Sequence, residues 1–541
     1  MAATDLTTCT GAPLPVGMRP GALSRPEAQA AAIIAAFLVL RCAAAALIGL
    51  GIDESYSVSV ARALHLSYFD HPPLQYWMVH AAAPIVGWGQ ASRIPFLLLF
   101  VGTCWLMFLL TRRLFGARAG VWAVLALNLS GFFTLAAASW VLPDGPLDFW
   151  LTGAGLALAW GWFEPAAAPA DKPAAPLGAW LAVGACIGLA ALSKYQAALF
   201  CLGLLAFVLT APGRWRELTR RGPYLAAALT LLVLAPVMVW NARHGWASFA
   251  FQGGRGAPNH RLDLSAPLVA LAGQAGVLAP WVFVVLAAAA VGALKAGPRD
   301  QRRWLCLMLA APPICVFTLA PLMAKHTLPH WASPGWLMLF PLAGERLAAA
   351  AETRAWPRIW AGASAAALVL LGGLFTWDAS SGWIGASLTS LGSRSDPTLE
   401  TLAWTQVREA LGARGLLRGE ASPVAALRWN DAGKLAIALG GLAPVTVLSP
   451  DAREFAYQGD PGRLVGRDVL IVARPGALDE SMDDLRPYFR SITPLAPISV
   501  GRRGRTEIRL NVAMGHAMLR PYLEGDWARA ARSRGGAPAS P

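Results

Sequence analysis

Long apolar runs recur along the first two thirds of the chain and are separated by short polar segments. A helix that crosses the hydrocarbon core of a bilayer needs about 20 apolar residues, with a range of about 17–25. Eleven windows meet this requirement, so the pattern predicts about eleven transmembrane helices. The windows are 30–51, 94–111, 119–138, 146–163, 177–193, 195–211, 223–240, 267–294, 304–323, 333–350 and 358–377.

The composition agrees with this pattern and excludes other classes of protein. Of the 541 residues, 56% are hydrophobic and 14% are charged, and the mean hydropathy is +0.48. Soluble domains carry about 25% charged residues, and a single soluble core stops growing well below this length. A net charge of +14 would indicate nucleic acid as the partner of a soluble protein. In a polytopic membrane protein the basic residues determine the orientation in the membrane, so no nucleic-acid partner is predicted.

The basic residues indicate the membrane topology, because they are unevenly divided between alternate loops. With the N-terminus in the cytoplasm, 17 Lys and Arg residues fall on the inner side and 7 on the outer side, counted to residue 377. Positively charged loops stay in the cytoplasm, so this orientation is predicted. An odd number of spans then places the C-terminal part outside the cytoplasm.

After residue 377 the composition changes to that of a soluble domain. Residues 378–541 carry 20 basic and 17 acidic residues, and short apolar runs alternate with helix-like segments. This alternation predicts a small α/β domain outside the cytoplasm, with a frayed C-terminal end. The expected regions are a disordered cytoplasmic tail over 1–28, a transmembrane domain over 29–377 and this domain. The apolar runs are 422–428, 445–448 and 469–473, and the helix-like segments are 397–412, 431–440 and 479–490.

Unusual polar side chains gather on the predicted outer side. All eight histidines lie there, whereas the inner loops contain arginines but no histidine. The first outer loop begins with Asp53 and Glu54 at the end of the first span. A carboxylate at the edge of the bilayer is partly desolvated, so its pKa can rise until it accepts a proton from an alcohol or amine. An acidic N-cap of an interfacial helix over 54–66 would explain the same pair, and both roles can hold together.

Five motifs follow one another on this side. They are Asp53-Glu54, Tyr68-Phe69-Asp70-His71-Pro72-Pro73-Leu74, Pro143-Asp144-Gly145-Pro146-Leu147, His244-Gly245-Trp246 and Lys325-His326-Thr327-Leu328-Pro329-His330-Trp331. In this order they resemble the motifs of the family 39 GT-C glycosyltransferases. That group includes the protein O-mannosyltransferases and the bacterial aminoarabinose transferases that modify lipid A. The resemblance covers roughly residues 30–377.

The resemblance implies a GT-C fold and inverting transfer of a hexose or pentose from a polyprenyl-phosphate donor. The acceptor would be a lipid, a glycan or a protein at the outer face of a bacterial inner membrane. By the same resemblance Asp53 is the catalytic base, Glu54 supports it, and Asp144 is a further catalytic carboxylate. The aminoarabinose transferases have a Lys where this chain has His71. A titratable imidazole thus replaces a fixed cation, which argues against aminoarabinose as the sugar.

The chemistry also requires cations, because negative charge builds up on the departing phosphate in the transition state. Arg243 and His244 are the first candidates, since they directly follow the end of a span. A lipid-headgroup contact or a snorkelling side chain would explain any single cation equally well. The further substrate-binding candidates are Asp70, His71, Lys194, Lys325, His326 and His330.

A divalent metal is an alternative part of this site. Asp53, Asp70 and Asp144 with one of His244, His326 or His330 offer suitable ligand types. No metal-binding spacing of residues supports such a site. We therefore predict no metal ligands and no certain cofactor.

A transporter or lipid flippase with an outer polar gate is the alternative function. Transporters place charge near the bilayer midplane on broken helices and often carry inverted repeats. In this chain only Arg41 lies near the middle of a span, and no internal repeat is visible. We read Arg41 as a structural partner of a polar group such as Asn128 or Gln274, and we favour the glycosyltransferase.

Overall fold

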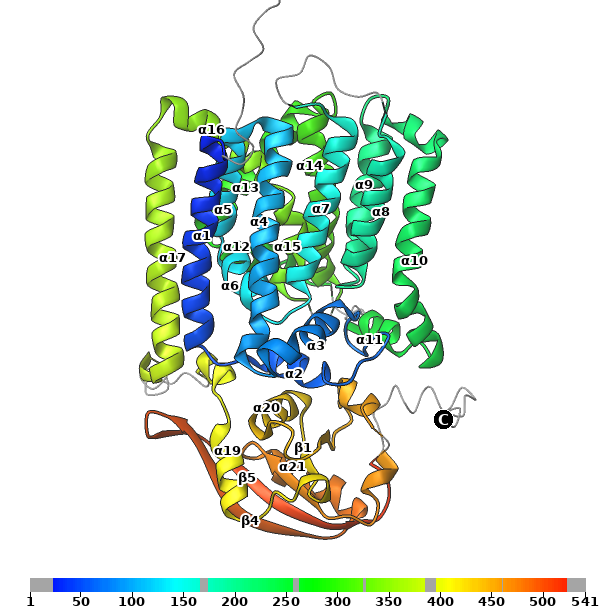
Figure 1. Cartoon of the computed structure of the whole chain (residues 1–541), viewed down its shortest axis with the longest axis vertical. Helices are drawn as coiled ribbons and strands as arrows, with labels where there is room; N and C mark the ends of the chain where they lie inside the picture. The colour runs from blue at the N-terminus through cyan, green and yellow to red at the C-terminus, as the bar shows by residue number, and fades with distance from the viewer. Residues whose placement is uncertain are drawn as a thin grey trace, which may run out of the picture.

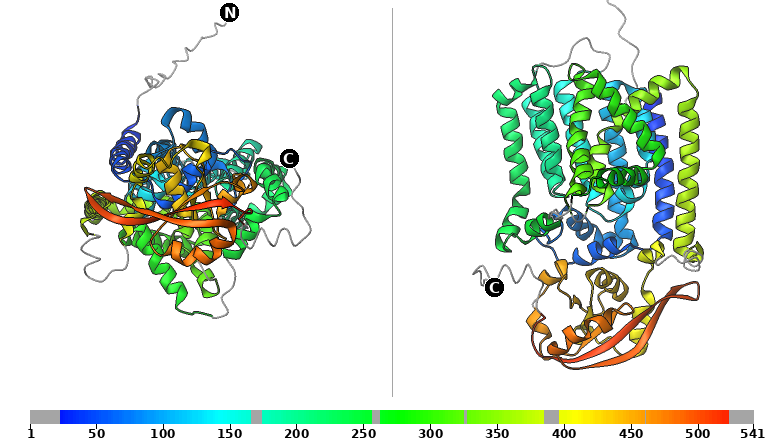
Figure 2. Two further views of the ribbon diagram at one scale, coloured as in Figure 1. Left: turned by 90° about the horizontal axis from the view of Figure 1, so that it is seen from below. Right: turned by 180° about the vertical axis from the view of Figure 1, so that it is seen from behind.

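The computed structural model describes residues 23–165, 174–255, 262–324, 327–384, 396–459 and 461–522. Long helices stand side by side in one bundle, and the C-terminal residues form a separate layer against one end of it (Figure 1). Short helices and loops fill the level between the two (Figures 1 and 2). Most of the predicted N-terminal tail, and the end of the chain that was predicted to fray, lie outside the described residues.

Among the described residues, the bundle contains five helices that are long and apolar enough to cross a membrane. Two bent helix pairs raise this number to seven if each pair is one span. The polytopic helical fold is confirmed, whereas the number of eleven spans is not. The five are α1 (Arg25–Leu47), Gln90–Phe115 with α4 (Ile94–Phe115), α10 (Arg221–Arg243), Gln301–Leu322 with α14 (Gln301–Leu319), and α17 (Trp356–Ser381).

Most of the other predicted windows contain shorter or broken helices, whereas the window 146–163 contains one unbroken helix of 19 residues. α5 (Ala117–Asn128) and α6 (Gly131–Ser139) meet at 78°, and α12 (Ala266–Leu278) and α13 (Pro280–Ala296) meet at 114°. The second break falls at Ala279, whose φ is +76° and whose successor is a proline. The remaining bundle helices are α7 (Asp144–Trp162), α8 (Leu177–Ala191), α9 (Ala197–Thr210), α15 (Ser333–Leu337) and α16 (Phe340–Thr353).

Arg41 has the structural role predicted for it inside the bundle. Its Nη2 donates to Asn128 Oδ1 at 2.5 Å, and its Nε donates to the backbone oxygen of Thr134 at 3.1 Å. The guanidinium also lies over the ring of Phe100, 4.6 Å from its centroid. These contacts join α1 to the break between α5 and α6, so the charge serves helix packing.

The C-terminal layer is a small α/β domain, as predicted. Its five-stranded sheet has the order β2-β1-β3-β5-β4, with β1 parallel to β2 and β3. The last two strands form a long antiparallel hairpin that the sequence analysis did not predict. The strands are β1 (Val424–Ala426), β2 (Val445–Val447), β3 (Val469–Ala473), β4 (Phe489–Arg502) and β5 (Arg505–Met518), and the helices are α19 (Thr405–Ala413), α20 (Trp429–Leu439) and α21 (Ala477–Leu485).

Helix α20 packs directly on α2 (Ile52–Val60), the short interfacial helix that begins beside Asp53. A Cβ atom on Gly433 would lie 2.6 Å from the backbone nitrogen of Tyr56, so only glycine permits this approach. The neighbouring Lys434 is buried and donates to the backbone oxygens of Leu50 and Leu402. The C-terminal domain and the first loop also share one apolar cluster. The domain is therefore fixed against the helix that carries the predicted base.

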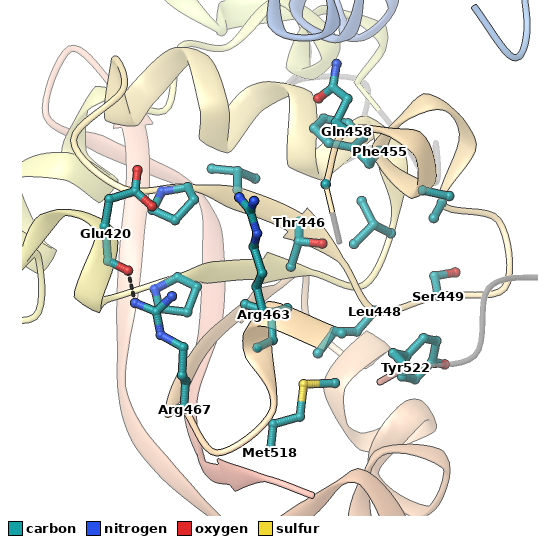
Figure 3. A pocket seen from close by; sticks show the side chains of 18 residues that line it. Glu420, Thr446, Leu448, Ser449, Phe455, Gln458, Arg463, Arg467, Met518 and Tyr522 are labelled. Carbon is teal, nitrogen blue, oxygen red and sulfur yellow. Dashed lines mark hydrogen bonds between the residues drawn. The ribbon is translucent and has the colours of Figure 1, made fainter. Parts of the chain in front are cut away.

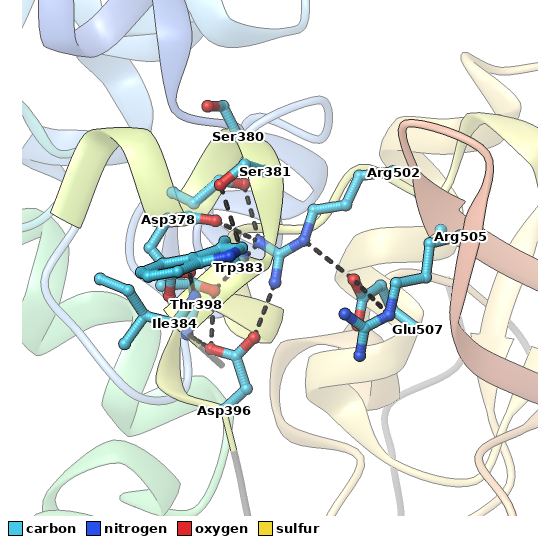
Figure 4. Close-up of polar contacts among 12 residues, drawn as sticks. Asp378, Ser380, Ser381, Trp383, Ile384, Asp396, Thr398, Arg502, Arg505 and Glu507 are labelled. Atoms are coloured by element: carbon cyan, nitrogen blue, oxygen red, sulfur yellow. Dashed lines mark hydrogen bonds and ion pairs between the residues drawn. The ribbon is translucent and has the colours of Figure 1, made fainter. Parts of the chain in front are cut away.

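A second attachment joins the hairpin to the end of the last long helix (Figure 4). Arg502 at the end of β4 donates to the backbone oxygens of Asp378 and Ala379 in α17, at 3.0 and 2.8 Å. It also forms buried ion pairs with Asp396 at 2.6 Å and Glu507 at 3.3 Å. Cations at a helix C-terminus are favourable, so Arg502 binds carbonyls in the last turn of α17 and holds the hairpin beside it.

The orientation can be tested with reporter fusions. A reporter fused after residue 400 should be active only outside the cytoplasm, because this residue belongs to the C-terminal layer. A reporter fused at residue 217, in the turn between α9 and α10, should be active only inside. Alkaline phosphatase and green fluorescent protein fusions would measure this, and a cytoplasmic signal at 400 would contradict the predicted orientation.

Candidate active site

Charged and polar side chains from both halves of the chain meet where the bundle contacts the C-terminal layer. They come from α2, the loop before α3 (Leu74–Val86), the start of α7, the link between α8 and α9, α11 (Ala247–Arg255), the turn η4 (Pro329–Ala332) and the turn η7 (Arg453–Tyr457). Of the predicted carboxylates, Asp53 and Asp70 act electrostatically on each other, and His71 experiences the charges of both Asp70 and Asp144. Asp53, Asp70 and Asp144 thus lie around one site.

Asp53 lies in the first turn of α2 and is accessible to solvent. It makes no hydrogen bond or ion pair with any residue that the structure describes. The surrounding protein nevertheless raises the pKa of this carboxyl by desolvation, with Asp70 raising it further and Arg453 opposing both. Asp53 is therefore a reachable carboxylate with an increased proton affinity.

Glu54, the next residue, in contrast accepts hydrogen bonds at both carboxylate oxygens. It is buried and pairs with Arg93 through two bonds, Nε to Oε1 at 2.7 Å and Nη2 to Oε2 at 2.5 Å. It also accepts from the backbone nitrogens of Gly51 and Val141 at 2.9 and 3.1 Å. These contacts cap α2 and tie it to the residue that precedes α4 and to the loop between α6 and α7, which fixes the position of Asp53.

Asp70 is buried and held by two phenols. Tyr56 and Tyr76 donate to its Oδ1 at 3.0 and 3.2 Å, and Arg453 Nη1 lies 3.6 Å from its Oδ2. Its backbone oxygen accepts from Gln252 of α11. Asp70 therefore connects the first loop, α11 and the C-terminal domain.

Asp144, at the start of α7, forms a buried ion pair with Lys194, whose Nζ lies 2.8 Å from Oδ1. Lys194 follows α8 at the gap that separates two apolar helices. One turn further along α7, Asp148 is completely buried, and neither of its oxygens has a hydrogen-bond partner among the described residues. The pair brings a cation beside two carboxylates at the end of the bundle.

Two half-buried histidines face this pair. Burial and the charges of Lys194 and Arg255 lower the pKa of His71 to about 4. The same causes lower the pKa of His330 to about 4, and its ring stacks on Phe132 with centroids 5.7 Å apart. Both imidazoles are therefore neutral at pH 7 and have the capacity to donate and accept hydrogen bonds there.

Two arginines of the site were not among the predicted binding residues. Arg255, at the end of α11, lies over the ring of Trp331 at 4.9 Å and has no ion pair within 4.0 Å among the described residues. Arg453 belongs to the C-terminal domain, and its guanidinium lies over Trp429 at 4.0 Å. Its φ of +50° is a strained conformation for a non-glycine residue. The charges of both arginines act on Asp53 and Asp70.

The remaining predicted residues lie at the edge of this site or outside the described residues. Arg243 is exposed and makes no hydrogen bond or ion pair with the described residues. His244 stacks on Trp240, with ring centroids 4.2 Å apart, and contacts Tyr457 edge-on at 5.4 Å. His244 Nδ1 also bonds the backbone oxygen of Trp240 at 2.7 Å. These contacts place His244 at the rim, between α10 and the C-terminal domain, and Lys325 and His326 lie outside the described residues.

The described part of the chain contains no group of three or more His, Cys, Asp or Glu residues placed to hold a metal ion. The carboxylate of Asp144 accepts a hydrogen bond from Lys194, and that of Asp70 accepts hydrogen bonds from Tyr56 and Tyr76. Asp144 and Asp70 are thus used for internal contacts.

The fold and part of the sequence are similar to known proteins. A family model described as dolichyl-phosphate-mannose-protein mannosyltransferase matches residues 70–240. The crystal structure of ArnT from Cupriavidus metallidurans in the apo state superposes with a TM-score of 0.62 at 19% identity, covering 91% of this chain and 99% of that chain. ArnT from the same organism bound to undecaprenyl phosphate superposes with a TM-score of 0.59 at 19% identity, covering 89% and 97%. Comparison with curated protein sequences gave no match.

The two findings agree with each other and with the motifs. The family match includes Asp70, His71, Asp144 and Lys194, and the ArnT likeness extends through the C-terminal domain. The predicted resemblance to GT-C glycosyltransferases of the ArnT and protein mannosyltransferase type is confirmed, and so is the fold of an integral membrane protein with a small C-terminal domain.

Proposed function

We propose that this chain is a membrane glycosyltransferase that moves a sugar from a polyprenyl-phosphate donor to an acceptor at the outer face of a bacterial inner membrane. The observation that carries the proposal is the unengaged carboxylate of Asp53 in a site that also contains Lys194, Arg255 and Arg453. A base and nearby cations are what transfer from a phosphate-linked sugar requires. The ArnT bound to undecaprenyl phosphate, whose fold this chain shares, supports the carrier.

In the proposed reaction an acceptor hydroxyl attacks the anomeric carbon of the donor sugar. The hydroxyl proton moves to Asp53 as the new glycosidic bond forms. The bond between the anomeric carbon and the phosphate oxygen breaks on the opposite face, so the configuration inverts. The electron pair leaves with the polyprenyl phosphate, and Arg255 and Lys194 stabilise the growing negative charge. Neutral His71 and His330 can donate hydrogen bonds without adding charge.

Arg255 takes the phosphate-binding role that the sequence suggested for Arg243. Arg255 has no competing ion pair among the described residues, and its charge acts on Asp53, Asp70, His71 and His330. Arg243 is exposed and is not among the main charges acting on these groups. Lys194 already forms an ion pair with Asp144, so it helps to bind phosphate only as part of that pair.

Substitution of Arg255 by Gln should lower kcat/KM for the donor by on the order of 10- to 100-fold, because a hydrogen bond to a charged group contributes about 1.5–3 kcal/mol. Arg243→Gln is the matched control and should retain near wild-type kcat/KM. Initial rates at varied donor concentration in membranes would measure both variants. Equal losses in the two variants would contradict the assignment.

The acceptor class can be identified by mass spectrometry of envelope lipids, glycans and proteins from cells with and without the gene. The proposal predicts a glycan modification that disappears on deletion and returns with the wild-type chain but not with Asp53→Asn. An unchanged envelope accompanied by accumulation of a lipid-linked sugar on one leaflet would favour the transporter alternative. The position of Arg41, bonded to Asn128 and Thr134 inside the bundle, argues against that alternative.

A further inference from the structure

The C-terminal domain contains a pocket of its own (Figure 3). Its volume is about 300 Å³, at the lower end of the range for small-molecule sites. It lies beside the edge strand β2, between η7, the turn η8 (Pro461–Leu464) and the end of β5. None of the described residues that line it belongs to the predicted catalytic or substrate-binding set.

Two arginines give this pocket a positive character. The side chain of Arg463 extends across it (Figure 3) and forms no hydrogen bond or ion pair with the described residues. Arg467 lines the same side and donates to the backbone oxygen of Glu420. Glu420 is the only acidic residue among the described lining residues. A guanidinium without a partner matches the geometry of a phosphate group.

The rest of the wall is mixed in polarity. Thr446 and Ser449 contribute hydroxyl groups that can bond to a sugar or glycerol, and Leu448 and Met518 provide an apolar surface. A small polar body attached to the anion fits this lining better than a bare inorganic ion. The volume allows a single ring or a glycerol unit, not a long chain.

The pocket and the candidate active site share the turn η7. Phe455 and Gln458 face the pocket, and Gln458 also donates to the backbone oxygen of Val60 at 2.9 Å. From the same turn, Arg453 reaches Asp70. A ligand in the pocket therefore lies against the segment that carries one of the cations of the active site.

We propose that this pocket binds a phosphate monoester of a sugar or of glycerol, from a soluble metabolite or from a lipid headgroup. Arg463 and Arg467 hold the phosphate, and the hydroxyls beside β2 hold the polar body. The site is separate from that of the donor phosphate, so the proposal does not depend on sugar transfer.

The test is calorimetric titration of the full chain in phosphatidylcholine nanodiscs with sn-glycerol 3-phosphate and glucose 6-phosphate. At least one of the two probes should bind at a single site, and Arg463→Gln should raise its Kd at least tenfold. Arg490→Gln, which removes an exposed arginine of the same domain outside the pocket, should leave the Kd unchanged. Absence of binding of both probes, or an unchanged Kd in Arg463→Gln, would overturn the proposal.

A second pair of measurements separates this pocket from the active site. Arg255→Gln should retain the binding, whereas Thr446→Val, an uncharged change within the pocket, should weaken it. Loss in Arg255→Gln with retention in both pocket variants would place the phosphate in the active site and refute the proposal. Nanodiscs with 10% phosphatidic acid should compete with sn-glycerol 3-phosphate if the natural ligand is a lipid headgroup, and should not compete if it is soluble.

Discussion

Replacement of Asp53 by Asn is expected to reduce transfer by about 10²–10⁴-fold, which is the usual contribution of a general base. Asn preserves the size of the side chain, and the start of α2 is held by Glu54 through Gly51 and Arg93, so the variant should fold. It cannot take up the proton of the acceptor. The rate of sugar transfer from a labelled polyprenyl-phosphate donor, measured in membranes, would detect this loss.

Two further variants serve as controls for that experiment. Asp479→Asn changes an exposed carboxylate of α21 and should leave the rate unchanged. Asp144→Asn should reduce the rate by disturbing Lys194, and donor binding should weaken as well. If Asp53→Asn retained near wild-type turnover while Asp144→Asn lost it, the base would be Asp144.

Substitution of Arg93 by Gln should have the largest effect on stability. Arg93 is buried, pairs with Glu54 and donates to the backbone oxygens of Ala45, Ile48 and Gly49 at 2.9, 2.7 and 3.0 Å. Removal of one partner from a buried ion pair leaves an uncompensated charge and costs about 3–5 kcal/mol. The unfolding midpoint in detergent, followed by tryptophan fluorescence, should fall accordingly.

An exposed ion pair provides the comparison. Arg118 lies 2.9 Å from Glu352, and both side chains are largely exposed, so Arg118→Gln should cost no more than about 1 kcal/mol. The double variant Arg93→Gln with Glu54→Gln should recover part of the loss, because no charge is then left buried. Equal midpoints for Arg93→Gln and Arg118→Gln would show that the Glu54 pair does not hold α2.

The membrane architecture was predictable because it depends on local composition. Each predicted window contains a helix or a bent pair in the structure, and Lys194 falls in the gap between two short apolar helices. A polar partner for Arg41 was also predictable, since an intramembrane charge needs one; of the two candidates, Asn128 bonds it and Gln274 bonds Thr318 and Trp336. The number of spans was not, because the breaks near Ser130 and Ala279 depend on tertiary contacts such as the bond from Ser130 Oγ to the backbone oxygen of Leu278.

The β4–β5 hairpin was missed for a physical reason. Pro494 and Pro497 interrupt β4, and many of its side chains are exposed, so the segment lacks the apolar run that identified the other strands. Its stability comes from pairing with β5 and from the bonds of Arg502 to α17. Neither contact is local in sequence.

The candidate site was predictable only in part. Asp53 and Asp144 could be selected because they are acidic residues at the ends of predicted spans, and Asp70 because it belongs to a motif of the first outer loop. Arg453 could not, because it reaches the site only when η7 docks against the first loop, where Glu454 bonds His65 and the backbone nitrogen of Phe69. Its contribution depends on the packing of two distant parts of the chain.

The central claim is tested most directly with the purified chain in nanodiscs, a polyprenyl-phosphate donor labelled in the sugar, and the acceptor fraction identified from the envelope. The wild-type chain should transfer the label with inversion at the anomeric carbon and release polyprenyl phosphate in equal amount, and Asp53→Asn should do neither. Transport of intact labelled donor across sealed vesicles without release of polyprenyl phosphate would contradict a glycosyltransferase.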